Sequence, residues 1–174
     1  MPEAVIVATA RSPIGRAGKG SLRDLRPDDL AATIVRAALD QVPALDRHTI
    51  DDVYLGCGLP GGESGFNMGR VVNILNDMDD VPAATITRYC ASSVQTTRMA
   101  FHAIKAGEGD CYVAAGVESI SQVSGYPKSE EELHPRLFGE GAIAEVYIPM
   151  GQTAENVAER WDVCLLYTSP SPPD

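Results

Sequence analysis

Basic residues are scarce in this 174-residue chain, where 14 Lys and Arg face 24 Asp and Glu and leave a net charge of −10. Broad binding to nucleic acid or to anionic membranes needs a basic surface, so neither partner is expected. No apolar run approaches the ~20 residues that cross a bilayer. The chain also does not open with a basic segment followed by a long apolar one, as a secretory signal does. We therefore expect a cytoplasmic protein without a membrane segment.

Cysteine is sparse as well, with four residues: Cys57, Cys90, Cys111 and Cys164. None of them forms a Cys-x-x-Cys pair, which argues against a zinc knuckle or a dithiol redox motif. Their sparse placement without a secretory signal fits a reducing compartment. Each thiol is then either core filler or a reactive group, and we expect no metal site.

What the chain does have is 44% hydrophobic and 22% charged residues, which is typical of a soluble globular protein. Short apolar, β-branched runs predict strands at residues 4–8, 53–56, 84–87 and 111–115. Helical spacing between them predicts helices over residues 27–42, 67–76 and 92–106. This alternation predicts an α/β fold with a largely parallel sheet.

The alternation stops after Gly116, and residues 121–148 are polar without a clear strand. We interpret them as an excursion or the start of an inserted subdomain. A short helix is expected from Thr153, as its N-cap, to Trp161.

Residues 11–20 form a loop rich in glycine and basic side chains. An anion-binding loop is one interpretation and a solvated connection is the other. The connection is favoured because the spacing matches no phosphate-binding fingerprint.

The segment around Cys90 carries the sharpest chemical signal. Cys90 lies where a predicted strand ends and a predicted helix begins, and ligands bind at the carboxyl ends of strands in open α/β sheets. The first-turn amides of that helix would favour a thiolate, and the small residues 91–93 would let a substrate carbonyl approach. The alternative is a buried cysteine that packs a helix against a sheet.

Four segments, in this order along residues 4–163, resemble the thiolase family of CoA-dependent enzymes. They are residues 5–15 (VIVATARSPIG), 90–95 (CASSVQ), 114–121 (AAGVESIS) and 150–158 (MGQTAENVA). The resemblance implies that Cys90 is the nucleophile, that coenzyme A is a substrate and that no cofactor is permanently bound. It places Met150 near the acyl or pantetheine end of the substrate and implies a homodimer or homotetramer.

The family's other two catalytic groups are a His in a Gly-His-Pro segment and a Cys in a Cys-x-Gly-x-Gly segment, and this sequence contains neither. His134 precedes a proline but follows Leu133, so we expect it to be a surface residue. The resemblance thus implies the nucleophile part of an acyltransferase that cleaves or forms 3-oxoacyl-CoA, with no turnover from this chain alone. The direction and the acyl chain length stay open.

Three positions depart from the family pattern: Thr87 stands where Asn is common, Ser93 where Gly is common, and Pro149 where biosynthetic members tend to have His. Ser93 adds a side chain beside the nucleophile, which bears on the size of the acyl pocket. Pro149 argues against close kinship with the short-chain biosynthetic type.

The fold that the resemblance implies is the thiolase N-terminal α/β/α half, with a mixed five-stranded sheet cut off within the inserted loop domain. Residues 1–120 would be that domain without its last strand, and residues 121–163 the start of the loop domain. From Cys164 the sequence leaves the family, and three prolines among the last five residues exclude the helix expected there. We interpret residues 164–174 as a non-native tail from an adaptor or a frame error, and a proline-rich ligand as the alternative.

Two rival functions fit the same fold. A ketoacyl synthase-like condensing enzyme is disfavoured by the 150–158 segment. A non-catalytic lipid carrier or scaffold on the same fold is disfavoured by Cys90 in its small-residue setting.

Overall fold

The computed structural model describes residues 2–123, 129–138 and 143–163. The chain forms two compact units, Met1–Tyr126 and Pro127–Asp174. Each unit is described by itself below.

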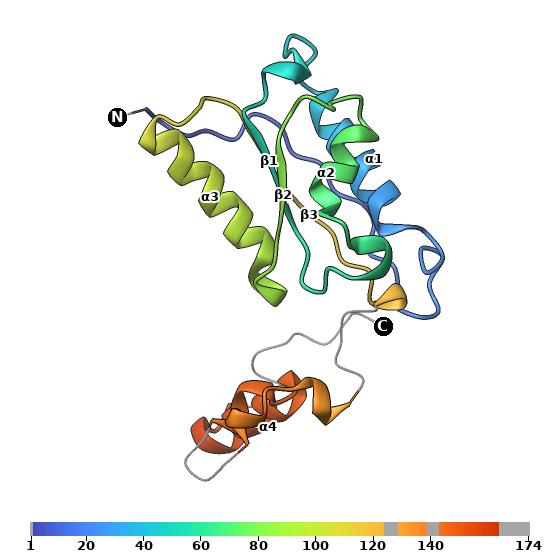
Figure 1. The fold of residues 1–174 in the computed structure, drawn as a ribbon, viewed down its shortest axis with the longest axis vertical. Helices are drawn as coiled ribbons and strands as arrows, with labels where there is room; N and C mark the ends of the chain where they lie inside the picture. Colours follow the sequence, from blue (N-terminus) through green and yellow to red (C-terminus); the bar gives the residue numbers. More distant parts are fainter. Residues whose placement is uncertain (1, 124–128, 139–142, 164–174) are drawn as a thin grey trace. The chain divides into compact units, whose positions relative to one another are not determined.

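A three-stranded parallel sheet organises the first unit (Figure 1). Its strands are β1 (Asp52–Gly56), β2 (Ala83–Ile86) and β3 (Tyr112–Gly116), in the order β2-β1-β3. In the register, Gly56 at the end of β1 lies opposite Ile86 on one side and Gly116 on the other. The three strands therefore end at the same edge, which confirms the α/β prediction with a parallel sheet.

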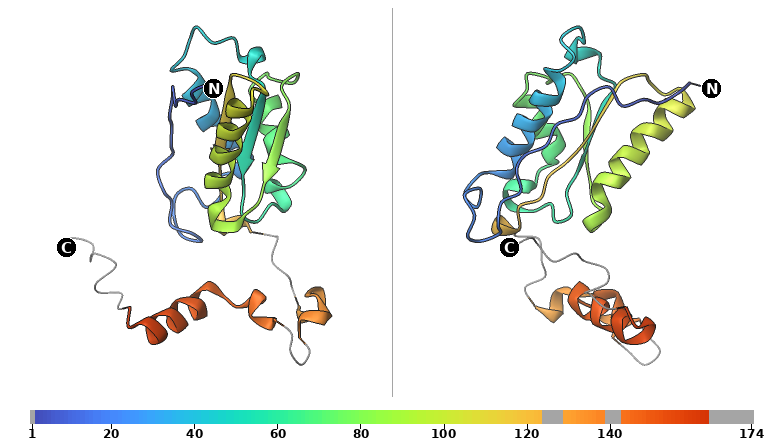
Figure 2. Two further views of the ribbon diagram at one scale, coloured as in Figure 1. Left: turned by 90° about the vertical axis from the view of Figure 1, so that its left-hand side faces the viewer. Right: turned by 180° about the vertical axis from the view of Figure 1, so that it is seen from behind.

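Three helices cover the two faces of this sheet (Figures 1 and 2). Helices α1 (Pro27–Leu39) and α2 (Met68–Ile74) pack on one face, and α3 (Ser92–Ala106) packs on the other. Helix α1 begins with a proline at its first position and acids in its first turn, which favour a helix start. Helix α3 ends at Gly107, whose φ of 77° is the left-handed conformation that glycine adopts readily.

The main core lies between the sheet and the α1–α2 layer. Val53 and Leu55 of β1 are fully buried there, together with Met68 and Val72 of α2. The alternate residues of β1 face α3, where Gly56 allows the start of that helix to come close. The outer face of α3 leaves Val94 and Phe101 exposed.

The prediction of a buried first strand at residues 4–8 is wrong. This segment has neither helix nor strand, and the side chains of Val5, Ile6 and Val7 are exposed by 68–78%. The hydrogen bonds that hold its surroundings are made by side chains: Lys105 donates to the carbonyl of Pro2, and Gln41 to that of Thr9. An apolar, β-branched run becomes a strand only when a neighbouring strand pairs with its backbone, and within the described residues none does.

The second unit contains α4 (Met150–Trp161) and short 3₁₀ turns. The prediction of Thr153 as its N-cap is wrong: the helix begins one turn earlier with Pro149 as N-cap. The amide of Thr153 donates to the carbonyl of Pro149 at 3.1 Å. Proline lacks an N–H and has a fixed φ, so it suits a helix start. His134 is exposed, as predicted. In the described parts of the chain, no helix has the length and apolarity to cross a membrane. The predicted non-native tail at residues 164–174 lies outside the described residues.

Candidate active site

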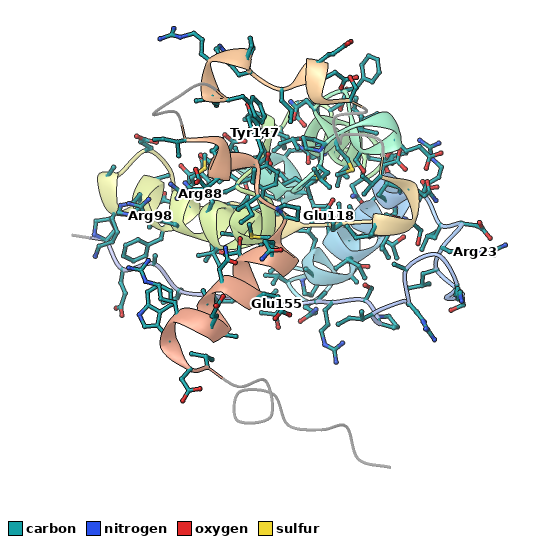
Figure 3. All side chains as sticks on the ribbon, turned by 90° about the horizontal axis from the view of Figure 1, so that it is seen from below. Arg23, Arg88, Arg98, Glu118, Tyr147 and Glu155 are labelled. Carbon is teal, nitrogen blue, oxygen red and sulfur yellow. The ribbon has the colours of Figure 1, made fainter. Side chains whose placement is uncertain are left out.

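The segments that follow the three strands meet at one edge of the sheet. Cys57 continues the pairing beyond β1 and donates its amide to Ile86 at 2.9 Å, while Val117 beyond β3 donates to Gly56 at 2.9 Å. Figure 3 labels Arg88 and Glu118, which follow β2 and β3 respectively. The segments that contain Cys57, Cys90 and Glu118 therefore all begin at the carboxyl ends of the three parallel strands.

Cys90 lies in the 3₁₀ turn Tyr89–Ala91, directly ahead of α3, and is exposed. The preceding residue, Tyr89, has a φ of 48°, a left-handed conformation that is uncommon for a residue with a side chain. The N-cap of α3 is Ala91, which has no side-chain oxygen to cap the first amides of the helix. The thiol therefore sits on a tight strand-to-helix turn, next to an uncapped helix N-terminus.

Hydrogen bonds to Ser92 hold this turn in shape. The Ser92 hydroxyl accepts from the Arg88 amide at 2.8 Å and donates to the Tyr89 carbonyl at 2.7 Å. Ser92 is only 4% exposed, so these bonds are shielded from water. The Arg88 guanidinium donates to Gln95 Oε1 at 2.6 Å. This bond links the residues just before the turn to the N-terminal part of α3.

Two glycines let the first turn of α3 lie directly on the sheet. A Cβ added at Gly56 would lie 2.8 Å from the carbonyl carbon of Ser92 and 2.9 Å from the amide nitrogen of Ser93. A Cβ added at Gly116 would overlap the hydroxyl of Ser93. The departure from Gly at position 93 thus places an oxygen over the end of β3, and its effect on the acyl pocket stays a prediction.

A second set of contacts surrounds Gly58, just beyond β1. Its amide donates to Glu118 Oε2 at 2.6 Å, and its carbonyl accepts from the Thr87 hydroxyl at 2.9 Å. The other oxygen of Glu118 lies 3.8 Å from the Cys57 thiol. Thr87, which also departs from the family pattern, therefore links the segments that follow β1 and β2.

The cysteines differ sharply in their surroundings. Cys57 is 1% exposed, and burial, followed by the charge of Glu118, raises the pKa of its thiol. Burial, followed by the charge of Asp51, also raises the pKa of the half-buried Cys111. A buried thiol that keeps its proton is a poor nucleophile. Cys90 is the exposed one among the three cysteines that the structure describes.

The remaining predicted site residue, Met150, is the first residue of α4 in the second unit and is 67% exposed. Its role near a bound substrate stays a prediction. Residues 2–123, 129–138 and 143–163 contain no group of three His, Cys, Asp or Glu side chains that could hold a metal ion.

Sequence patterns alone assigned no role at this edge to Glu118, Gly58 or Tyr89. A signal for the first two was present: Glu118 and Cys57-Gly58 each follow an apolar run that ends in glycine, and parallel strands end at a common edge. The left-handed φ of Tyr89 has no such signal, because tyrosine seldom adopts it.

Comparisons with known proteins agree on one family. Residues 4–164 match the family described as "Thiolase, N-terminal domain". The chain is 42% identical over 164 residues to a 3-ketoacyl-CoA thiolase of Bacillus subtilis, covering 94% of this chain and 41% of that protein. It is 39% identical to the Escherichia coli 3-oxoadipyl-CoA/3-oxo-5,6-dehydrosuberyl-CoA thiolase, covering 91% of this chain and 43% of that protein.

A solved structure gives the same picture at the level of the fold. The crystal structure of the Bacillus anthracis acetyl-CoA acetyltransferase superposes with a TM-score of 0.76 at 30% identity and covers 94% of this chain. Only 43% of that chain is matched in return. The present chain therefore spans about two fifths of the length of the relatives that it matches.

Proposed function

The chain belongs to the thiolase family, and from this premise we propose that it is the nucleophile-bearing part of an acyltransferase acting on 3-oxoacyl-CoA. The observation that carries the proposal is the setting of Cys90: an exposed thiol on a tight turn at the carboxyl edge of the sheet, beside an uncapped helix N-terminus. Cys57 and Cys111 are buried or half-buried and offer no comparable setting.

In the proposed reaction, the Cys90 thiolate adds to the 3-keto carbonyl of the substrate. The bond between C2 and C3 breaks, its electron pair leaves with acetyl-CoA, which takes up a proton at C2, and the shortened acyl group stays on sulfur as a thioester. A CoA thiolate then attacks this thioester, and the acyl group passes to CoA while Cys90 is released. The reverse sequence is a Claisen condensation.

Charge develops on a carbonyl oxygen in both steps, and one donor aimed at that oxygen supplies roughly 3–4 kcal/mol. Proton transfers to and from the thiols and the α-carbon need two further acid–base groups. The sequence contains neither a Gly-His-Pro nor a Cys-x-Gly-x-Gly segment. We expect those groups to come from the rest of the protein, and this chain alone to show no turnover.

The names of the relatives support a 3-oxoacyl-CoA as the class of substrate without selecting a chain length. They include 3-ketoacyl-CoA and β-ketoadipyl-CoA thiolases and an acetyl-CoA acetyltransferase. We further propose that Met150 contacts the acyl or pantetheine end, that the last strand of the sheet lies outside this chain, and that the whole protein is a cytoplasmic homodimer or homotetramer.

The test is a chimera in which residues 1–163 replace the matching part of the Bacillus subtilis 3-ketoacyl-CoA thiolase. Its rate of CoA-dependent cleavage is measured with a short and a long 3-oxoacyl-CoA, next to the same chimera carrying Cys90→Ser. The proposal predicts cleavage by the first protein and none by the second. A folded chimera that cleaves neither substrate would overturn the proposal. So would a chimera whose cleavage rate is unchanged by Cys90→Ser.

A further inference from the structure

Glu118 makes an unusual contact for a surface acid, because its carboxylate reaches across the edge of the sheet. It lies two residues beyond β3, yet Oε2 accepts the amide of Gly58, beyond β1, at 2.6 Å. Gly58 is buried, so its amide has little access to water and depends on this acceptor oxygen. Oε1 meanwhile faces the thiol of Cys57 at 3.8 Å.

Gly58 lies next to Tyr89, the residue that precedes the nucleophile Cys90. A Cβ built on Gly58 would come within 3.4 Å of both the carbonyl carbon and the α-carbon of Tyr89. The backbone of Tyr89, the residue with the unfavourable φ of 48°, therefore lies beside Gly58 with room for no more than a methyl group between them. Such a conformation persists only where its surroundings hold it in place.

Both polar groups of the Gly58 residue are tied by side chains, its amide by Glu118 and its carbonyl by Thr87. Thr87 belongs to the segment after β2 and Glu118 to the segment after β3, so the two bonds fix Gly58 from both neighbouring strands. The order of contacts is then Glu118, Gly58, Tyr89 and finally Cys90.

We propose that Glu118 is a positioning residue for the nucleophile: its carboxylate clamps Gly58 beneath Tyr89 and so holds Cys90 at the N-terminus of α3. This inference rests on the proposed role of Cys90. It assigns to Glu118 no contact with substrate and no proton transfer. What matters is the reach of the side chain and an acceptor oxygen at Gly58, rather than a negative charge near Cys90.

Two substitutions separate reach from charge. Glu118→Gln keeps the length of the side chain and an acceptor oxygen but removes the charge. Glu118→Asp keeps the charge but is one methylene shorter, so its carboxylate no longer reaches the Gly58 amide. The matched control is Glu108→Asp, the same shortening at an exposed glutamate just beyond the C-terminal end of α3.

The measurement is the rate at which iodoacetamide alkylates each cysteine of the 174-residue chain, followed by peptide mapping as a function of pH. We expect Glu118→Gln and Glu108→Asp to keep the Cys90 rate of the parent chain. Glu118→Asp should slow Cys90 by about two- to fivefold, the size of the effect that a helix terminus exerts on a nearby charge. It should also open Cys57 to alkylation and speed amide hydrogen exchange at Gly58.

The proposal is overturned if Glu118→Asp leaves the Cys90 rate unchanged, or if Gln and Asp alter it alike. Should Glu118→Asp fail to fold, Gly58→Ala provides the same test, because the added Cβ would lie 2.6 Å from Glu118 Oε2 and displace it. A parent chain in which Cys90 reacts no faster than Cys111 would count against the proposed function. Hydrogen exchange at Gly58 and the exposure of Cys57 would still decide whether Glu118 holds the loop.

Discussion

Replacing Gly56 with alanine should destabilise the protein, although the residue lies in a strand and has no left-handed φ. The new methyl group would lie 2.8 Å from the carbonyl carbon of Ser92 and 2.9 Å from the amide nitrogen of Ser93. Carbon atoms in contact are relaxed at about 3.5–4.0 Å, so the start of α3 or the end of β1 must move by roughly 0.6–1.2 Å. Both obstacles are backbone atoms, which cannot rotate away.

The expected size of the effect follows from two opposing terms. Overpacking of this kind costs about 1–3 kcal/mol. Gly→Ala without a clash stabilises a protein by about 0.4–1 kcal/mol, because it restricts the unfolded chain. Midpoints of about 2 and about 0.7 kcal/mol give a net loss of about 1.3 kcal/mol in the free energy of unfolding. The sign of the change therefore tells whether α3 lies as close to the sheet as the structure has it.

Urea unfolding followed by far-UV circular dichroism measures this change. Gly151→Ala is the matched control, because a Cβ at that position of α4 would have no atom within 4 Å, and we expect no loss there. The displaced helix start should also slow the alkylation of Cys90. A Gly56→Ala protein as stable as the parent chain, or more stable, would refute the close packing of α3 on the sheet.

Three further outcomes are expected. Iodoacetamide near neutral pH should modify Cys90 well before Cys57, which is 1% exposed and has a raised pKa; equal rates in the folded chain would contradict this. The backbone amides of Cys111 and then Asp110 donate to the Asp51 carboxylate and lower its pKa. Asp51 therefore stabilises the fold above the unfolded pKa of about 3.9, and this stabilisation is lost as the pH falls through the lower folded pKa. Asp51→Asn should therefore reduce the free energy of unfolding at neutral pH and make its decline in acid shallower, and an unchanged urea midpoint at neutral pH would argue against this. The hydrogen bond that the His48 ring donates to the Asp80 carboxylate, followed by the charge of Asp80, raises the pKa of His48. This stabilisation is present below about pH 6.5 and is lost as the pH rises through the higher folded value. Asp80→Asn should remove that pH dependence from urea midpoints, and an identical pH profile would contradict it.

Local patterns predicted most of the elements because local physics determines them. Helix α3 was expected over residues 92–106, and the structure has it as Ser92–Ala106, since Gly107 provides a left-handed stop. Helix α1 begins at Pro27 as expected, because proline and the two acids after it suit a helix N-terminus. The three strands that pair with one another were found to within one or two residues.

The predictions from sequence fail where the structure of a segment depends on residues far away in the chain. Residues 4–8 have the composition of a strand, but pairing is a property of two segments, and the described residues provide no partner for this one. The shape of the Cys90 turn likewise depends on Ser92, Gly58 and Glu118, which come from three different segments. Cys90 itself could be singled out from the strand-to-helix junction and the small residues that follow it. The contacts that hold it could not.

The role of Cys90 as nucleophile can be tested by finding where the acyl group is held during the reaction. The chimera carrying residues 1–163 is mixed briefly with a 3-oxoacyl-CoA in the absence of free CoA, quenched in acid, and mapped by mass spectrometry. We expect an acyl group on the peptide that contains Cys90, and none on the Cys90→Ser protein. An acyl group on another cysteine, or cleavage without any adduct on Cys90, would contradict the central claim that Cys90 is the nucleophile.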